Sequence, residues 1–267
     1  MEKSAIIHEI NKKQSLLCVG LDTDLDKIPN HLLQEEDPIA AFNKSIIDAT
    51  KEFAISYKLN IAFYERLGPK GWMALEKTLS YIPKNCFTIA DAKRGDIGNT
   101  ADMYAKTFFE TYQFHSITVS PYMGRDSVIP FLKHPDKWAI LLALTSNEGA
   151  SDFQLQKLAN GRFLYEQVIE QSKEWGNQAN TMYVTGATKA QFLRNIRTLV
   201  PNHFLLVPGV GAQGGSLEDT VKNGRNKDIG LLINNSRGII YADGGVSFAE
   251  AAFDAARTQQ MVMKNLL

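Results

Sequence analysis

Short apolar runs recur along the chain, and each is bounded by polar or turn-forming residues. The runs cover 16–21, 54–59, 86–90, 116–120, 139–144, 182–185, 204–207 and 230–234. Runs of this length that are apolar at nearly every position are typical of strands buried on both faces of a parallel sheet. The pattern therefore predicts eight buried strands.

Between the runs, apolar positions recur three and four residues apart, which indicates helices that bury one face. One such stretch follows Asp37-Pro38, a pair that favours a helix start, and another spans 101–112. Eight strands that alternate with helices in 267 residues predict the α/β class, as a (β/α)8 TIM barrel forming a single domain, 1–267. A doubly wound open sheet is the structural alternative. The stretch 149–180 is long for one crossover, and we expect a helical insertion there.

Composition narrows the classes of function. Lys plus Arg equals Asp plus Glu at 29 each, so the chain has no overall basic field to attract nucleic acid or anionic membrane. The chain has neither a secretory h-region nor a stretch apolar enough to cross a bilayer, so we expect a cytoplasmic protein with a small ligand. Cys18 and Cys86 lie inside apolar runs, and we expect buried free thiols instead of a zinc site.

The densest charge cluster, Asp91-Ala-Lys93-Arg-Gly-Asp96, comes directly after the third apolar run. On an extended backbone, residues two apart leave the same face, which would place the side chains of Asp91 and Lys93 together. Gly95 lets the chain turn before Asp96. Such a cluster is costly to desolvate unless its charges pair well or serve chemistry. It therefore marks a candidate reaction site, with a solvated surface turn as the plain alternative.

Polar residues also follow other runs at the same, carboxyl, end. They are Asp22 after the first run, Lys58 and Asn60 at the second, Ser146 after the fifth and Arg237 after the eighth. Barrel enzymes of this type place their active sites at the carboxyl ends of the strands. His115 and His203 instead precede strands, which predicts neither a histidine base nor a histidine metal site.

A glycine-rich segment, Pro208-Gly-Val-Gly-Ala-Gln213-Gly-Gly, follows the seventh run. Its G-x-G-x-x-G spacing is a weak match to a dinucleotide site, because no acidic residue follows the next strand. In barrels, the loops after strands seven and eight form phosphate pockets, and the guanidinium of Arg237 can bind phosphate through two parallel hydrogen bonds. The two loops together predict a phosphate site.

These motifs together resemble the orotidine 5′-phosphate decarboxylase family. The resemblance rests on Asp91-x-Lys93-x-x-Asp96, the glycine-rich segment and Asn234-Asn-Ser-Arg237-Gly-Ile-Ile-Tyr241, and it covers the chain from Asp22 to Tyr241. It implies a (β/α)8 homodimer, a carboxy-lyase that converts orotidine 5′-phosphate to UMP and CO2, the last step of de novo pyrimidine biosynthesis. The family uses no metal and no organic cofactor.

The resemblance also implies roles for individual residues. Lys58, Asp91 and Lys93 would be catalytic, with Asp96 contributed across the dimer interface together with Ile97 and Thr100. The substrate-binding residues would be Asp22, Ile97, Thr100, Ser146, Pro208, Gln213 and Arg237. One departure concerns Gly215, where some family members carry a tyrosine, so the phosphate contacts would differ from theirs.

Three other functions compete with this interpretation. A metal-dependent sugar-phosphate decarboxylase or epimerase of the same barrel group would place a carboxylate after the second strand, where this chain has Lys58. A Schiff-base aldolase would need a neutral lysine, which neighbouring acids disfavour. The third hypothesis is not an enzyme: a noncatalytic barrel that binds pyrimidine nucleotides.

Overall fold

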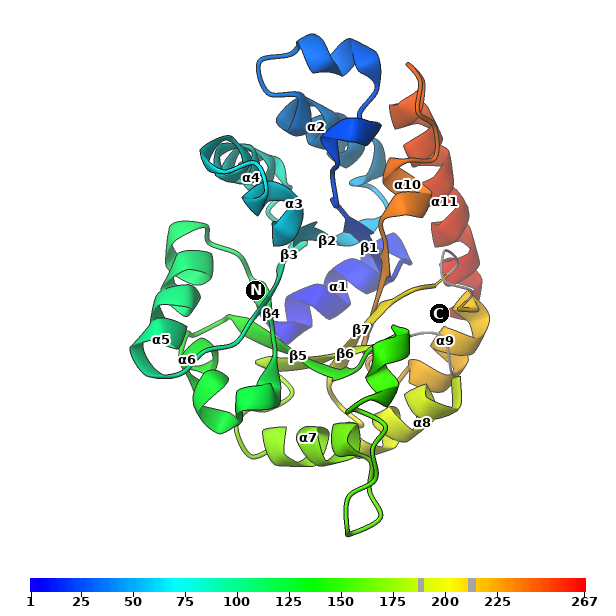
Figure 1. Cartoon of the computed structure of the whole chain (residues 1–267). Helices are drawn as coiled ribbons and strands as arrows, with labels where there is room; N and C mark the ends of the chain where they lie inside the picture. Colours follow the sequence, from blue (N-terminus) through cyan, green and yellow to red (C-terminus); the bar gives the residue numbers. More distant parts are fainter. Residues whose placement is uncertain (187–189, 211–214) are drawn as a thin grey trace. The chain divides into compact units, whose positions relative to one another are not determined.

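The computed structural model describes residues 1–186, 190–210 and 215–267. Eight strands form a closed parallel barrel in chain order (Figure 1), which confirms the predicted (β/α)8 class. The strands are β1 (Leu17–Gly20), β2 (Ala54–Asn60), β3 (Phe87–Arg94), β4 (Ser116–Val119), β5 (Trp138–Leu144), β6 (Thr181–Thr185), β7 (Phe204–Pro208) and β8 (Leu231–Asn235). Each lies on one of the predicted apolar runs, and β3 continues past its run to include Asp91 and Lys93.

One helix precedes the first strand, and the other helices follow strands. The helices are α1 (Lys3–Lys13), α2 (Pro38–Thr50), α3 (Ile61–Glu65), α4 (Pro69–Tyr81), α5 (Gly98–Lys106), α6 (Ile129–Leu132), α7 (Leu164–Ser172), α8 (Ala190–Leu199), α9 (Leu217–Gly224), α10 (Arg237–Ile240) and α11 (Phe248–Leu266). As predicted, α2 starts at Pro38, and the Asp37 carboxylate accepts a hydrogen bond from the Ala40 N–H at 3.1 Å. The helix predicted over 101–112 is correct in place but ends as α5 at Lys106, where a π-helical turn, Thr107–Thr111, replaces it.

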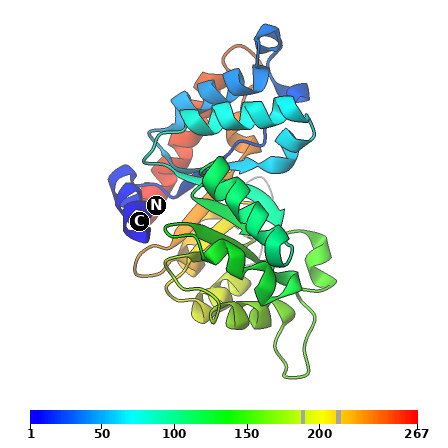
Figure 2. The ribbon, with the colours of Figure 1, turned by 90° about the vertical axis from the view of Figure 1, so that its left-hand side faces the viewer.

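The chain divides into two compact units, which we call unit 1 (1–3 and 93–233) and unit 2 (4–92 and 234–267). In unit 2, α2 packs against both α4 and α11, as Figures 1 and 2 show. In unit 1, β4 to β7 pair in parallel register and α8 packs against α9. The boundary falls inside β3, between residues 92 and 93.

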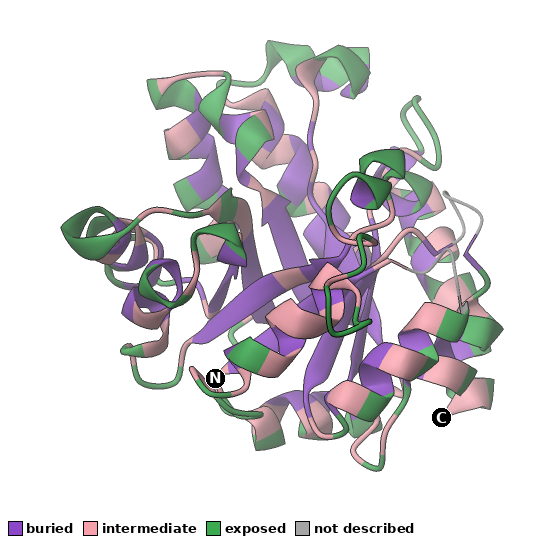
Figure 3. Ribbon diagram, turned by 60° about the horizontal axis from the view of Figure 1, so that its bottom comes forward, coloured by how far each residue is buried: buried purple, intermediate pink, exposed green. Residues whose placement is uncertain are grey.

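The strands are buried on both faces, which is why they are so continuously apolar (Figure 3). The helices instead alternate buried and exposed positions. The largest fully buried side chains of unit 2 include Tyr57, Tyr64 and Phe42. Burying a large apolar side chain of this kind contributes roughly 1.5–3 kcal/mol. Among the polar residues buried in these strands are Ser56 and Lys58 of β2, so β2 carries charge into the interior.

The stretch 149–180 contains one regular helix, α7. It begins in the short 3-10 turn Glu148–Ser151 and passes through an isolated antiparallel bridge between Lys157 and Phe163. The Glu166 carboxylate then accepts a hydrogen bond from the Phe163 N–H at 2.8 Å and caps the start of α7. These contacts are local to unit 1.

Candidate active site

The side chain of Lys58 lies between two carboxylates at the strand ends of unit 2. Its Nζ is 3.2 Å from Asp22 Oδ1 and 3.0 Å from Asp91 Oδ2. Lys58 lies on β2 and Asp91 on β3, while Asp22 comes two residues after the end of β1. Because these parallel strands pair in order, with Gly20 opposite Lys58, their carboxyl ends bring the three groups together. We call Asp22, Lys58 and Asp91 the charged triad.

The charged triad is largely out of water. The side chain of Lys58 is 6% exposed, and those of Asp22 and Asp91 are 20% and 11% exposed. Burial alone would lower the pKa of Lys58, but the charges of Asp22 and Asp91 outweigh it and raise that pKa above its ordinary value. Lys58 therefore stays an ammonium at neutral pH. A permanently charged amine cannot attack a carbonyl, which counts against a Schiff-base aldolase using this lysine.

Lys93 has a left-handed backbone, with φ of +47°. A residue other than glycine in this region costs on the order of 1–3 kcal/mol, and such strain clusters at functional sites. The Lys93 N–H donates to Thr118 Oγ1 of β4 at 2.9 Å, which helps to hold this conformation. The expectation of an extended backbone from Asp91 to Lys93 fails at this residue, so simple alternation of side chains does not apply to it.

Asp96, Ile97 and Thr100 lie in unit 1, in the segment from the end of β3 into α5. The Asp96 carboxylate accepts a hydrogen bond from the Ile97 N–H at 2.8 Å. Ile97 is 51% exposed, a high value for a large apolar side chain, and Thr100 is also exposed. This part of the predicted site therefore faces outward from unit 1.

The remaining predicted residues follow the strands as expected. Ser146 lies two residues after β5, Pro208 ends β7, and Arg237 is the exposed first residue of α10 after β8. Gln213 lies outside the described residues. The structure thus joins the charged triad within unit 2, whereas Lys93, Ser146 and Pro208 belong to unit 1.

The loop after β1, which carries Asp22, is held by two tyrosines that the sequence did not single out as site residues. The Tyr64 hydroxyl donates to the Leu21 carbonyl at 3.1 Å. The Tyr241 hydroxyl donates to the Asp22 carbonyl at 3.0 Å and accepts from the Asp24 N–H at 2.7 Å. Tyr241 ends a motif visible in the sequence, but only the fold reveals what its hydroxyl contacts.

Both cysteines are buried free thiols, as predicted. Burial raises the pKa of Cys18 to about 12, and it also raises that of Cys86. The Cys18 Sγ lies 3.6 Å from Asn234 Oδ1. A thiol that stays protonated is a poor nucleophile, so neither cysteine suits covalent catalysis.

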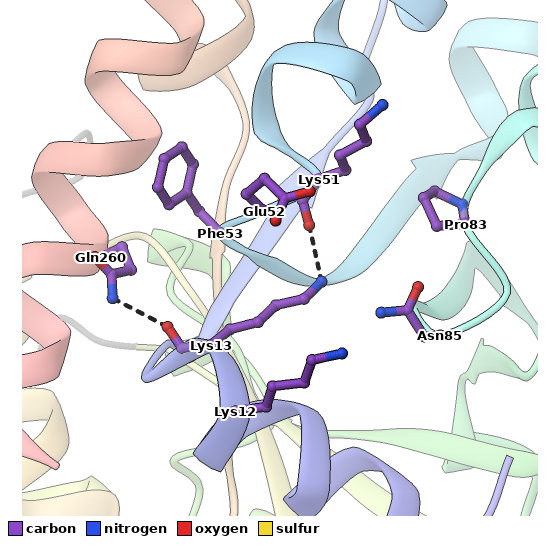
Figure 4. A pocket seen from close by; sticks show the side chains of 8 residues that line it. All are labelled: Lys12, Lys13, Lys51, Glu52, Phe53, Pro83, Asn85 and Gln260. Atoms are coloured by element: carbon purple, nitrogen blue, oxygen red, sulfur yellow. Dashed lines mark hydrogen bonds between the residues drawn. The ribbon is translucent and has the colours of Figure 1, made fainter.

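A separate pocket of about 460 Å³ in unit 2 includes Lys12, Lys13 and Lys51 in its lining (Figure 4). Two of these lysines, Lys13 and Lys51, are hydrogen-bonded within the protein, and Lys12 is 62% exposed to water. Lys13 Nζ donates to the carbonyls of Lys51 and Ala54 at 2.8 Å each, Lys51 pairs with Asp48, and Glu9 lies 3.9 Å from both Lys12 and Lys13. This charge balance indicates a structural role.

Within 1–186, 190–210 and 215–267, no group of three or more His, Cys, Asp and Glu side chains is placed to hold a metal ion. Over the same residues, every helix is too short or too polar to cross a membrane.

A parallel eight-stranded barrel with buried charges at the carboxyl ends of its strands has the architecture of a barrel enzyme. The family model described as "Orotidine 5'-phosphate decarboxylase / HUMPS family" matches residues 15–252. The chain belongs to this family.

Known members of the family are similar to this chain over its whole length. An orotidine 5′-phosphate decarboxylase of Phocaeicola vulgatus is 58% identical over 270 residues, covering 100% of this chain and 99% of that protein. One from Bacteroides fragilis is 57% identical over 270 residues, covering 100% and 98%. The solved OMP decarboxylase of Leishmania donovani matches with a TM-score of 0.85 at 36% identity, covering 100% of this chain and 98% of that one.

Proposed function

We propose that this protein decarboxylates orotidine 5′-phosphate to UMP and CO2, the last step of de novo pyrimidine biosynthesis. Membership of the family and the names of its full-length relatives support this activity. The observation that carries the proposal is the charged triad, in which Lys58 pairs with Asp22 and Asp91 on adjacent strand ends. Strand β3, which carries Asp91, also carries Lys93.

The reaction breaks the bond between C6 of the pyrimidine and the carboxylate carbon. CO2 departs, the electron pair stays on C6 as a vinyl carbanion, and the Lys93 ammonium stabilises that charge and then donates a proton to C6. Solvent afterwards restores the proton to Lys93. Asp91 and Asp96 crowd the departing carboxylate with like charge and so favour its loss as CO2. Lys58 fixes one of these carboxylates, because its 3.0 Å bond holds Asp91 Oδ2.

The strained backbone of Lys93 supports this role. Backbone strain of roughly 1–3 kcal/mol persists only where the surrounding structure enforces it. The bond from the Lys93 N–H to Thr118 supplies part of that enforcement. Lys93 is therefore held in an arrangement that the chain would not adopt by itself.

In this proposal Asp22 and Lys58 also bind the ribose hydroxyls, Ser146 binds the amide edge of the pyrimidine and Pro208 lines the base pocket. Arg237 and Gln213 bind the phosphate. The exposed guanidinium of Arg237 at the start of α10 suits a phosphate, which it can bind through two hydrogen bonds. Binding energy from the phosphate, remote from C6, then favours the transition state.

We further propose a homodimer in which Asp96, Ile97 and Thr100 enter the partner's active site. Support comes from Ile97 itself, a large apolar side chain that is 51% exposed in the single subunit and would be covered at such an interface. Lys93→Ala and Asp96→Ala dimers would each be inactive. After the two variants exchange subunits, about a quarter of the active sites should be intact, because half of the dimers are mixed and each has one complete site. No recovery after confirmed exchange would place Asp96 in its own subunit's site.

The fold as one domain, 1–267, and a cytoplasmic location complete the proposal. Two free thiols fit a reducing compartment. The domain assignment is tested by urea unfolding, which should follow one transition by both fluorescence and circular dichroism.

The test of the activity is the loss of orotidine 5′-phosphate absorbance with purified protein in excess EDTA, comparing wild type with Lys93→Ala. We expect rapid turnover that collapses in the variant. No turnover of orotidine 5′-phosphate, together with turnover of a sugar phosphate that EDTA abolishes, would favour the metal-dependent sugar-phosphate branch. Tight binding of UMP without any turnover would favour the noncatalytic barrel.

A further inference from the structure

Tyr241 contacts two segments that carry different parts of the proposed site. Its backbone N–H donates to the Arg237 carbonyl at 3.2 Å and so closes α10. Its hydroxyl holds both the Asp22 carbonyl and the Asp24 N–H. One residue therefore joins the turn that presents Arg237 to the loop that presents Asp22, all within unit 2.

The ring of Tyr241 is fixed independently of its hydroxyl. It stacks on Phe42 with ring centroids 5.9 Å apart, and Lys27 Nζ lies 5.5 Å above it. Burial raises the pKa of Tyr241 to about 12, so the hydroxyl remains a donor at neutral pH. The two hydrogen bonds thus extend from a rigid ring.

The other side of the Asp22 loop is also held. Tyr64 bonds the Leu21 carbonyl, and the Thr23 hydroxyl donates to Asn43 Oδ1 at 2.5 Å. Asn43 in turn donates to the Tyr64 hydroxyl at 3.0 Å. The loop therefore has little freedom of its own, and among these contacts only those of Tyr241 lead to Arg237.

We propose that Tyr241 is a positioning residue that sets the separation between the phosphate-binding Arg237 and the ribose-binding Asp22. This inference rests on the proposed function, which assigns those two roles. A nucleoside monophosphate gains affinity from both groups only if their spacing matches its own, so the hydroxyl of Tyr241 should couple the two contacts.

The test is a double-mutant cycle on UMP affinity by calorimetry, using wild type, Tyr241→Phe, Arg237→Ala and the double variant. Tyr241→Phe keeps the stacked ring and removes the hydroxyl. We expect it to weaken UMP binding about ten-fold when Arg237 is present, a change typical of unmade buried hydrogen bonds. With Arg237→Ala, where no second contact remains to be aligned, the same change should cost less than about two-fold.

Tyr57→Phe is the matched control. Tyr57 is a buried tyrosine of the same unit whose hydroxyl bonds Thr50 at 2.9 Å and the Ile47 carbonyl at 3.3 Å, away from the Asp22 loop. It should leave UMP affinity unchanged. An equal loss in Tyr57→Phe, or the same factor for Tyr241→Phe in both backgrounds, would overturn the proposal.

The binding cycle separates this inference from the proposed activity. A wild-type protein that binds UMP but does not decarboxylate orotidine 5′-phosphate would refute the activity alone, and the cycle would still decide the role of Tyr241. A wild-type protein that does not bind UMP would overturn both.

Discussion

Replacing Lys58 with methionine would leave two carboxylates facing each other in a site that is mostly closed to water. Methionine is unbranched, like the lysine stem, so the packing is largely preserved while the charge is lost. The two bonds of 3.2 and 3.0 Å disappear, and Asp22 and Asp91 are only 20% and 11% exposed. Removing one partner from a buried ion pair costs about 3–5 kcal/mol, a large part of the roughly 5–15 kcal/mol that stabilises a typical domain.

The loss should depend on pH in a defined direction. Without the ammonium, the two carboxylates repel each other in a site that is mostly closed to water, and adding a proton to either one relieves that repulsion. Protonation therefore favours the folded variant, which recovers stability as the pH falls. The deficit relative to wild type should be larger at pH 7 than at pH 5.

Urea unfolding followed by circular dichroism measures both quantities, with Lys51→Met as the control. Lys51 is also paired, 2.9 Å from Asp48, but it lies in water and its side chain is 42% exposed. It should therefore change stability little. A deficit for Lys58→Met no larger than that of Lys51→Met, or one that grows toward pH 5, would refute the account of a desolvated charged triad.

Two further predictions concern packing and titration. An added Cβ at Gly20 would lie 1.8 Å from Ser236 Oγ. Gly20→Ala should therefore lower the free energy of unfolding in urea by about 1–3 kcal/mol. Gly244 has open space around it, so Gly244→Ala should leave the stability unchanged. Equal stability of the two would contradict the close approach of β1 and Ser236. Burial lowers the pKa of His203 to about 4, so folding should lose stability as the pH falls from 6.5 toward 4, and His203→Phe should lessen that slope. A slope unchanged by the substitution would assign the effect to other groups.

The strands could be predicted from the sequence because a strand that is buried on both faces is apolar at nearly every position. Each predicted run coincides with a strand, and the polar residues after the runs do lie at strand ends, as Lys58 and Asp91 show. The start of α2 was also predictable, since the Asp37 cap and Pro38 act within a few residues. Signals that are local in the chain therefore carried over to the structure.

What the sequence could not supply depends on contacts between distant segments. The left-handed backbone of Lys93 is sustained partly by Thr118, 25 residues away, and no property of Lys93 itself favours it. The bonds from Tyr241 to the Asp22 loop span more than two hundred positions. The early end of α5 is a local exception, a π-helical turn directly after the helix that the spacing of apolar residues did not indicate.

The two buried thiols make it possible to measure local unfolding of unit 2 by chemical labelling. Cys18 and Cys86 both belong to this unit, and neither exposes a thiolate to a reagent in the folded state. Their rate of alkylation under native conditions therefore measures how often unit 2 unfolds locally and exposes the thiols. Amide hydrogen exchange reports local unfolding in the same way. Ligand-induced tightening can be followed as slower labelling, with no engineered probe and no change to the chain.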